Sequence, residues 1–288
     1  MRYYHSTDGT GPRLLARHDG ALYDLTAVKP GVARFVDLCE AASITDRSID
    51  DIARGLLDSA EVRSDELLAD VGRPVRPGEV WAAGVTYRIS EEAREAESGM
   101  PEVYLDVYSG ERPEVFFKAT PNRTVGPNEA VGIRADSSWD VPEPELGVVV
   151  HRGEIVGYTI GNDMSSRSIE GENPLYLPQA KVYDRCCAIG PCVSSVDSVG
   201  DPHDLRMSMT IERDGETMYD GSTSTAEMVR SCEELLTYYA RHNDLPEMAV
   251  LLTGTSLVPD EGFTLEAGDE VEIEIEKIGT LRNDVVTV

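Results

Sequence analysis

The sequence predicts an α+β protein that is mainly β, with a small α/β domain at its N-terminus. Two segments, 205–212 and 271–276, alternate between apolar and polar residues, which is the period of half-buried strands. A third segment, 224–239, carries apolar residues at helical spacing. The chain of 288 residues is 41% hydrophobic and 27% charged, which is typical of a globular protein with one large or two smaller domains.

The predicted N-terminal domain comprises residues 1–75. Apolar residues on both sides of a His-Asp-Gly turn at 18–20 indicate a β-hairpin. Two weakly helical segments follow at 35–42 and 48–57, and Ser48 is the expected N-cap of the second. This part of the chain therefore mixes strands and helices.

A turn-rich segment at 72–78 separates this unit from the second predicted domain, residues 76–288. In that domain the strand at 205–212 leads into Asp214-Gly215, which predicts a hairpin turn. The later helix is expected to begin at a capping box formed by Ser224 and Glu227. We assign its apolar stripe to core packing and not to function.

The charge of the chain excludes some partners. The sequence has 26 basic and 53 acidic residues, a net charge of −27, so nucleic acid and anionic membranes are poor partners. Only four residues are lysine, and this depletion together with the excess of acid is typical of a protein surface in the concentrated salt of an extreme halophile.

Other features of the composition point to a cytoplasmic protein. The N-terminus is polar and does not resemble a signal peptide, and the apolar runs are too short to span a bilayer. The five cysteines include no Cys-x-x-Cys pair, which argues against a disulfide framework or a structural zinc site. The adjacent pair Cys186-Cys187 is expected to pack in the interior, whereas His18 and His151 beside turns are expected at the surface.

A candidate metal site lies in a predicted hairpin that pairs residues 142–150 with 155–160. Glu143 and Glu145 are two residues apart, so they project from the same face of a strand. If the turn is the three residues 152–154, Asp163 lies opposite Glu143, whereas a two-residue turn would rotate Asp163 to the other face. Three carboxylates would suit a hard divalent cation. The alternative is a solvated acidic face, which is common in so acidic a protein.

Two lysines are candidate functional residues, because the composition has replaced most others by arginine. Lys181 follows an uncharged stretch, 174–180, and Lys118 lies within the apolar segment 113–119. A desolvated lysine can act as a base, which arginine effectively cannot. The alternatives are a side chain that reaches along the surface and a structural ion pair.

Six segments together resemble the fumarylacetoacetate hydrolase family over residues 79–288. They are Gly84-Val-Thr-Tyr87, 113–119, Glu143-Pro-Glu145, 157–167, 252–256 and 268–272. The stretch 169–183 is similar to the 2-keto-3-deoxypentonate dehydratase branch, whose members act on D-arabinonate, D-xylonate or L-arabinonate derivatives and form 2,5-dioxopentanoate.

The resemblance implies a mixed β-roll catalytic domain, a homo-oligomer (dimer or tetramer) and a divalent cation, Mg²⁺ or else Mn²⁺ or Ca²⁺. Carried over by position, the metal ligands are Glu143, Glu145 and Asp163. Lys181 is expected to transfer the C3 proton of a 2-keto sugar acid, with its pKa lowered by burial and by the cation. Glu114 is the candidate acid for the leaving C4 hydroxyl. Substrate contacts are expected from Lys118, Ser165, Arg167, Gln179 and Thr255.

Two departures from the family pattern bear on the reaction. Family hydrolases carry a histidine soon after the Gly-x-x-Tyr motif, whereas here a charged helix without histidine is expected at 88–98, and Ser168 replaces an aspartate found in many members. Both argue against carbon–carbon hydrolysis, and the missing histidine fits an elimination that needs no activated water. Acylpyruvate hydrolysis, oxaloacetate decarboxylation and a non-catalytic metal- or ligand-binding role remain the alternatives.

Overall fold

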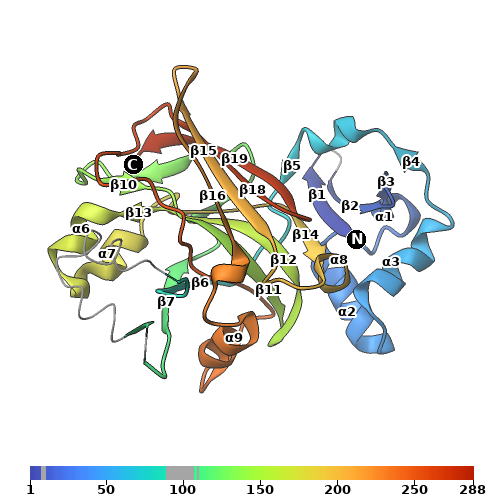
Figure 1. Cartoon of the computed structure of the whole chain (residues 1–288). Helices are drawn as coiled ribbons and strands as arrows, with labels where there is room; N and C mark the ends of the chain where they lie inside the picture. Colours follow the sequence, from blue (N-terminus) through green and yellow to red (C-terminus); the bar gives the residue numbers. More distant parts are fainter. Residues whose placement is uncertain (8–10, 89–106, 109) are drawn as a thin grey trace.

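The computed structural model describes residues 1–7, 11–88, 107–108 and 110–288. Strands are the commonest regular structure in the described residues and form a large and a smaller sheet, with short helices at the periphery (Figure 1). The predicted α+β, mainly β class is confirmed. None of the helices in the described ranges is long and apolar enough to cross a membrane.

The large sheet contains strands from both halves of the chain. Its strands are β1 (Arg2–Thr7), β2 (Pro12–His18), β3 (Ala21–Asp24), β4 (Val62–Arg63), β5 (Val71–Gly72), β6 (Glu79–Gly84), β7 (Glu114–Ala119), β8 (Thr124–Val125), β11 (Pro144–His151), β12 (Glu154–Asp163), β14 (Cys187–Ser195) and β17 (Met248–Leu252). Their order is β4-β3-β2-β1-β14-β12-β11-β17-β6-β7, with β5 beside β1 and β8 beside β14. The hairpins predicted at 18–20 and between 142 and 160 are confirmed as β2–β3 and β11–β12.

The smaller sheet has the order β16-β15-β18-β19-β9. Its strands are β9 (Val131–Ile133), β15 (Arg206–Arg213), β16 (Glu216–Ser224), β18 (Glu270–Ile275) and β19 (Gly279–Thr287), and β10 (Asp140–Val141) pairs separately with β13 (Ser165–Ser166). Alternate residues of β15 and β18 are buried, so both predicted strands and the Asp214-Gly215 turn are confirmed.

The helices are short. They are α1 (Leu25–Val28), α2 (Phe35–Thr45), α3 (Ile49–Leu57), η1 (Asp65–Leu68), α6 (Arg167–Glu172), η2 (Pro174–Tyr176), α7 (Leu177–Lys181), α8 (Val196–Val199), η3 (Thr225–Glu227) and α9 (Cys232–Ala240). The predicted N-cap is confirmed, because the Ser48 side chain accepts a hydrogen bond from the Asp51 N–H.

The predicted start of the later helix is wrong. Ser224 caps only the single 3₁₀ turn η3, and the backbone is extended at Met228. Helix α9 begins after Ser231, whose hydroxyl accepts from the Glu234 N–H. The apolar stripe from Cys232 to Tyr239 is buried, as expected of core packing.

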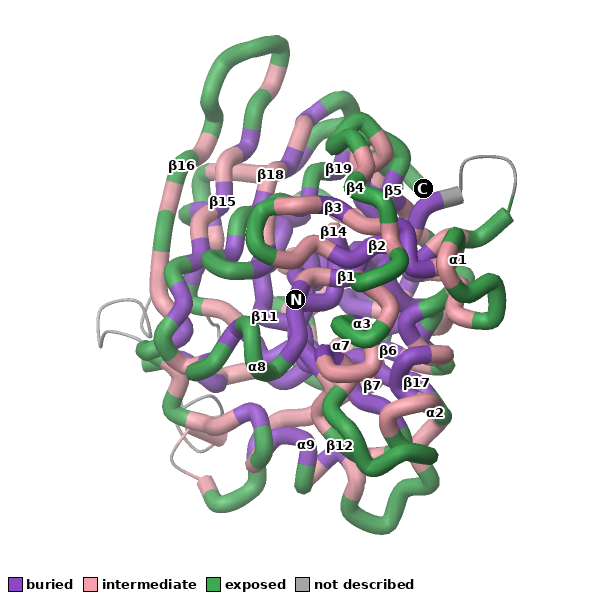
Figure 2. Tube along the Cα trace, turned by 90° about the vertical axis from the view of Figure 1, so that its right-hand side faces the viewer, coloured by how far each residue is buried: buried purple, intermediate pink, exposed green. Residues whose placement is uncertain are grey.

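The N-terminal strands continue the large sheet. β1 pairs with β14, and the core is one cluster that runs from Tyr3 and Phe35 to Val148 and Ile273. Figure 2 shows the buried residues concentrated in the central strands. The division into residues 1–75 and 76–288 stays a prediction.

Candidate metal centre and active site

The register of the β11–β12 hairpin places the first carboxylates. The turn is Arg152-Gly153, both with positive φ (49° and 87°), so the three-residue turn considered from the sequence is wrong. A register shift between Val149 and Val150 takes up one further residue of β12. The residue skipped at this shift compensates for the shorter turn. The Asp163 N–H donates to the Glu143 carbonyl at 2.9 Å. Asp163 therefore lies opposite Glu143, as the metal-site hypothesis requires.

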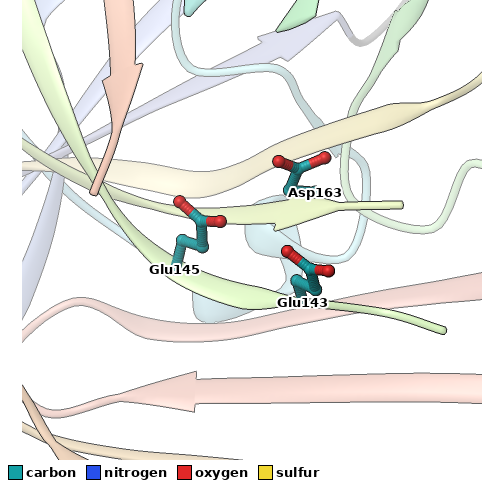
Figure 3. Close-up of side chains that lie close together, drawn as sticks. All are labelled: Glu143, Glu145 and Asp163. Atoms are coloured by element: carbon teal, nitrogen blue, oxygen red, sulfur yellow. The ribbon is translucent and has the colours of Figure 1, made fainter. Parts of the chain in front are cut away.

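The side chains of Glu143, Glu145 and Asp163 meet on one side of the two strands (Figure 3). One oxygen of each lies within 4.8 Å of the other two, and all three residues are buried. Oxygen ligands of one Mg²⁺ or Ca²⁺ ion lie 2.0–2.6 Å from it, so this spacing fits a shared cation. The donor set contains only carboxylate oxygens, which hard cations prefer.

The electrostatics of this triad also fit a bound cation. Burial raises the pKa of Glu145 well above its ordinary value, and the carboxylates of Asp163 and Glu143 raise it further. Burial would likewise raise the pKa of Glu143, but Lys181 and Arg167 together lower it to about 2. A divalent cation bound by the triad would oppose this rise and favour the charged form of Glu145.

Lys181 ends helix α7 inside this cluster. Its Nζ lies 2.8 Å from Glu143 Oε2, 2.6 Å from Ser165 Oγ and 3.5 Å from Asp163 Oδ2. Burial would lower the pKa of Lys181, but Asp163 and Glu143 outweigh burial and raise it. The predicted lowering of its pKa is therefore wrong for the metal-free chain. The structure does bring Lys181 and Ser165 into the site.

Lys118 lies behind the carboxylates and not in the cavity. Its side chain is fully buried, with Nζ 2.6 Å from Asp163 Oδ1. The ammonium also donates to the carbonyls of Met164, at 2.8 Å, and of Lys181. Burial opposes its charge, but Asp163 raises the net pKa of Lys118. This geometry supports a positioning role, whereas the expected contact with substrate finds no support in it.

A cavity of about 240 Å³ opens beside the triad. The predicted site residues that line it are Glu114, Glu143, Glu145, Asp163, Arg167, Lys181 and Thr255. Arg167 Nη2 lies 3.2 Å from Glu143 Oε1. Gln179 is exposed on α7 and is not among the lining residues, so its predicted role in substrate binding is not supported by this geometry.

Glu114 is held at the start of β7, opposite Gly84 of β6. Burial is the main cause that raises the pKa of Glu114 from 4.5 to about 7, against the opposing effect of Lys181. A Cβ at position 84 would collide with Oε2 of Glu114, so the glycine is required for this packing. Glu114 thus lines the cavity as a carboxylic acid whose raised pKa suits it to donate a proton near neutral pH.

Some residues of the site were not predicted. The Gly254 N–H donates to Glu145 Oε2 at 2.5 Å. The φ of Gly254 is 82°, which disfavours other residues, and a Cβ there would collide with the Thr86 side chain. Gly254 belongs to the 252–256 segment, but a backbone donor leaves no side-chain pattern to detect. Arg88 and Glu170 also line the cavity.

Three further expectations from the sequence concern the cysteine pair, a histidine and a charged helix. Cys186 and Cys187 are buried, as expected, whereas His151 is also buried and its predicted surface position is wrong. His151 is the last residue of β11, and it lies between its partners on the two neighbouring strands, Glu154 of β12 and Met248 of β17. The charged helix expected at 88–98 lies, apart from its first residue, outside the described residues.

Comparison with known proteins places this site in context. The fumarylacetoacetate (FAA) hydrolase C-terminal family profile matches residues 79–286. The chain is 61% identical over 288 residues to the probable 2-keto-3-deoxyxylonate dehydratase of Haloferax volcanii, covering 99% of this chain and 100% of that protein. It is 45% identical over 217 residues to the 2-dehydro-3-deoxy-D-arabinonate dehydratase of Saccharolobus solfataricus, covering 73% and 72%.

A solved structure is similar over the whole chain. It is that of 2-keto-3-deoxy-D-arabinonate dehydratase complexed with magnesium and 2,5-dioxopentanoate, with a TM-score of 0.85 and 34% sequence identity. The similarity covers 100% of this chain and 99% of that one.

Proposed function

This chain belongs to the fumarylacetoacetate hydrolase family, and we propose that it is a divalent-metal-dependent dehydratase that converts a 2-keto-3-deoxypentonate to 2,5-dioxopentanoate. The observation that carries this proposal is the buried Glu143–Glu145–Asp163 triad with the Lys181 ammonium in contact with it. The dehydratases of Haloferax and Saccharolobus support the substrate class.

Glu143, Glu145 and Asp163 would hold Mg²⁺, with Mn²⁺ or Ca²⁺ as alternatives. When bound, the ion supplies Lewis-acid polarisation of the 2-keto group, which acidifies the neighbouring C3–H bond. Lys181 takes the C3 proton. Carboxylates engaged with a cation attract the ammonium less strongly than they do in the metal-free chain, which favours the neutral amine needed for this step.

Glu114 donates the proton that the C4 hydroxyl needs to leave as water. A donor with a pKa of about 7 matches this task at neutral pH. Loss of a C5 proton and reprotonation at carbon then give the aldehyde, so the overall change is the loss of one water. Arg167 and Thr255 line the same cavity and would orient the substrate.

An elimination is favoured over hydrolysis by the histidine positions. The sequence contains no histidine between His18 and His151, so the segment after Gly84-Val-Thr-Tyr87 cannot provide an imidazole that orients water. A purely metal-binding role is disfavoured because a storage site does not need Lys181 among its carboxylates. We further propose that the enzyme is cytoplasmic, that it assembles as a dimer or tetramer, and that residues 76–288 form its catalytic domain.

The test is a panel of 2-keto-3-deoxy acids incubated with the enzyme and Mg²⁺, with products identified by NMR. We expect one equivalent of 2,5-dioxopentanoate per substrate consumed, and roughly 10²–10⁴-fold slower turnover by a Lys181→Met variant purified in the same way. Formation of pyruvate instead, or equal turnover by both proteins, would refute the proposal.

A further inference from the structure

A second cavity lies at the far end of two strands that lead to the active site. Its volume is about 480 Å³, and Gly78 and Met248 line it at the starts of β6 and β17. These strands are parallel neighbours, and the Gly78 N–H donates to the Met248 carbonyl at 2.7 Å. At their other ends Gly84 and Gly254 line the cavity beside the metal triad.

Basic side chains converge on this second cavity, which we call the arginine cavity after Arg34, Arg73 and Arg76. His5 also lines it, and the acidic residue among its lining is Glu247. Glu247 is already engaged, because its carboxylate lies 2.8 Å from the Arg152 guanidinium. A local excess of positive charge is unusual in a chain with 53 acidic and 26 basic residues.

Arg73 and Arg76 differ from Arg34 in their ion pairing. Within the part of the chain that the structure describes, neither Arg73 nor Arg76 forms an ion pair, although Arg34 lies 2.7 Å from Asp37. Arg73 Nη1 donates to the Pro121 carbonyl at 2.5 Å, which fixes one edge of a half-buried guanidinium and leaves its other donors available. Arg76 is exposed at the rim.

The backbone adds to the positive potential. Phe35 and Val36, the first two residues of the eleven-residue helix α2, line the cavity. The N-terminus of a helix carries a partial positive charge, which favours an anion. The Asp37 carboxylate offsets part of this charge, because it accepts from the Ala33 and Arg34 N–H groups. The pKa of His5 is lowered by burial and further by Arg34 and Arg73, which is the response expected of a group in a positive field.

We propose that the arginine cavity binds a small oxyanion, either the carboxylate groups of a dicarboxylic acid or a phosphate group. Guanidinium groups bind both through paired N–H donors, so the geometry defines the shared chemistry. This site is separate from the proposed dehydratase site and does not depend on that function.

The test uses the Mg²⁺-loaded protein, titrated calorimetrically with inorganic phosphate or with succinate at constant ionic strength set by KCl. Both probes carry oxygens that can also bind Mg²⁺, so the binding that the glutamine variants lose is the part that reports on the arginine cavity. We expect saturable binding of one of the two probes to the parent protein, about tenfold weaker in Arg76→Gln and weaker still in Arg73→Gln/Arg76→Gln. Preference for phosphate or for succinate identifies the source of the oxyanion.

The matched control is Arg206→Gln, which removes an exposed arginine of β15 outside this cavity. It should bind like the parent, and Arg76→Lys should retain part of the affinity because it keeps the charge. Equal binding by the parent and the glutamine variants, or no saturable binding, would overturn the proposal. So would a change in oligomer size in Arg76→Gln without any loss of anion binding, since the cavity would then be a subunit contact.

Discussion

Lys118 and Asp163 form an ion pair in the interior of the protein, with Nζ 2.6 Å from Oδ1 and both side chains at most 1% exposed. The same ammonium donates to the backbone carbonyls of Met164 and Lys181. One side chain therefore ties together a candidate metal ligand, the residue after it and the candidate base. This arrangement holds the site in place in the absence of metal.

Replacing Lys118 by methionine should destabilise the protein by about 3–5 kcal/mol, because the buried Asp163 carboxylate would lose its nearest cation and keep only Lys181 at 3.5 Å. Guanidinium denaturation of the metal-free protein measures this. The double variant Lys118→Met/Asp163→Asn is the control and should recover part of the loss, since it removes the stranded charge as well. A cost below about 1 kcal/mol for the single variant would show that the pair is not structural.

Removal of metal with EDTA should abolish turnover, and Mg²⁺ or Mn²⁺ should restore it. Glu145→Gln should weaken metal binding in calorimetry without lowering the melting temperature of the metal-free protein. The reason is that Glu145 is the carboxyl whose pKa is raised, so glutamine resembles its protonated form. Full turnover in metal-free protein would contradict the assignment of the triad.

Lys181→Met should lower kcat by roughly 10²–10⁴-fold with little change in KM, because a proton-transfer group acts mainly in the transition state. Lys181→Arg should not rescue, since guanidinium does not release its proton at working pH. An arginine variant that turns over like the parent would reduce Lys181 to a fixed positive charge, and Glu114 would then be the next candidate for the proton transfer.

Glu114 should make stability depend on pH. Its folded-state pKa of about 7 lies above the ordinary 4.5, so the stabilisation is complete below about pH 4.5 and is lost as the pH rises through 7. At about 1.4 kcal/mol per pH unit the loss is about 3 kcal/mol. Glu114→Gln should be free of this dependence, so its stability relative to the parent should increase between pH 5 and pH 8 in urea denaturation. Parallel pH profiles for the two proteins would show that the surroundings of Glu114 do not raise its pKa.

Salt should stabilise the fold. The net charge of −27 repels itself in dilute buffer, and the Debye length falls to about 3 Å at 1 M salt. The melting temperature should therefore rise along a KCl series from 0.1 to 2 M. A flat or falling series would mean that surface repulsion does not limit stability.

Local patterns in the sequence were enough to predict the strands and to place Glu143 and Glu145 on the same face, because strand periodicity depends only on neighbouring residues. The position of Asp163 was not decidable, since it depends on a two-residue turn and a compensating irregularity near Val150 that leave no distinct signal. Similarly, Ser224 and Ser231 each precede a glutamate by three residues, so the helix start was ambiguous until tertiary packing selected the second.

The role of Lys118 was beyond local reasoning for a different reason. Its partners Met164 and Lys181 are 46 and 63 residues away in the chain, and only the folded sheet brings them together. The exposure of Gln179 was also not predictable, because this residue is only two positions from Lys181 but faces solvent on α7. In so short a helix, the spacing of residues in the sequence does not predict which side chains face the cavity.

The distribution of amines gives this protein an internal reporter of local opening. Of its four lysines, Lys29 and Lys277 are exposed, whereas Lys118 and Lys181 are buried in the site. An amine-acylating reagent should therefore label the first two rapidly in the native protein and the other two only when the site unfolds. Mass spectrometry of the four peptides would then time the opening of the active site in the unmodified sequence, with the exposed lysines as the reference for reagent reactivity.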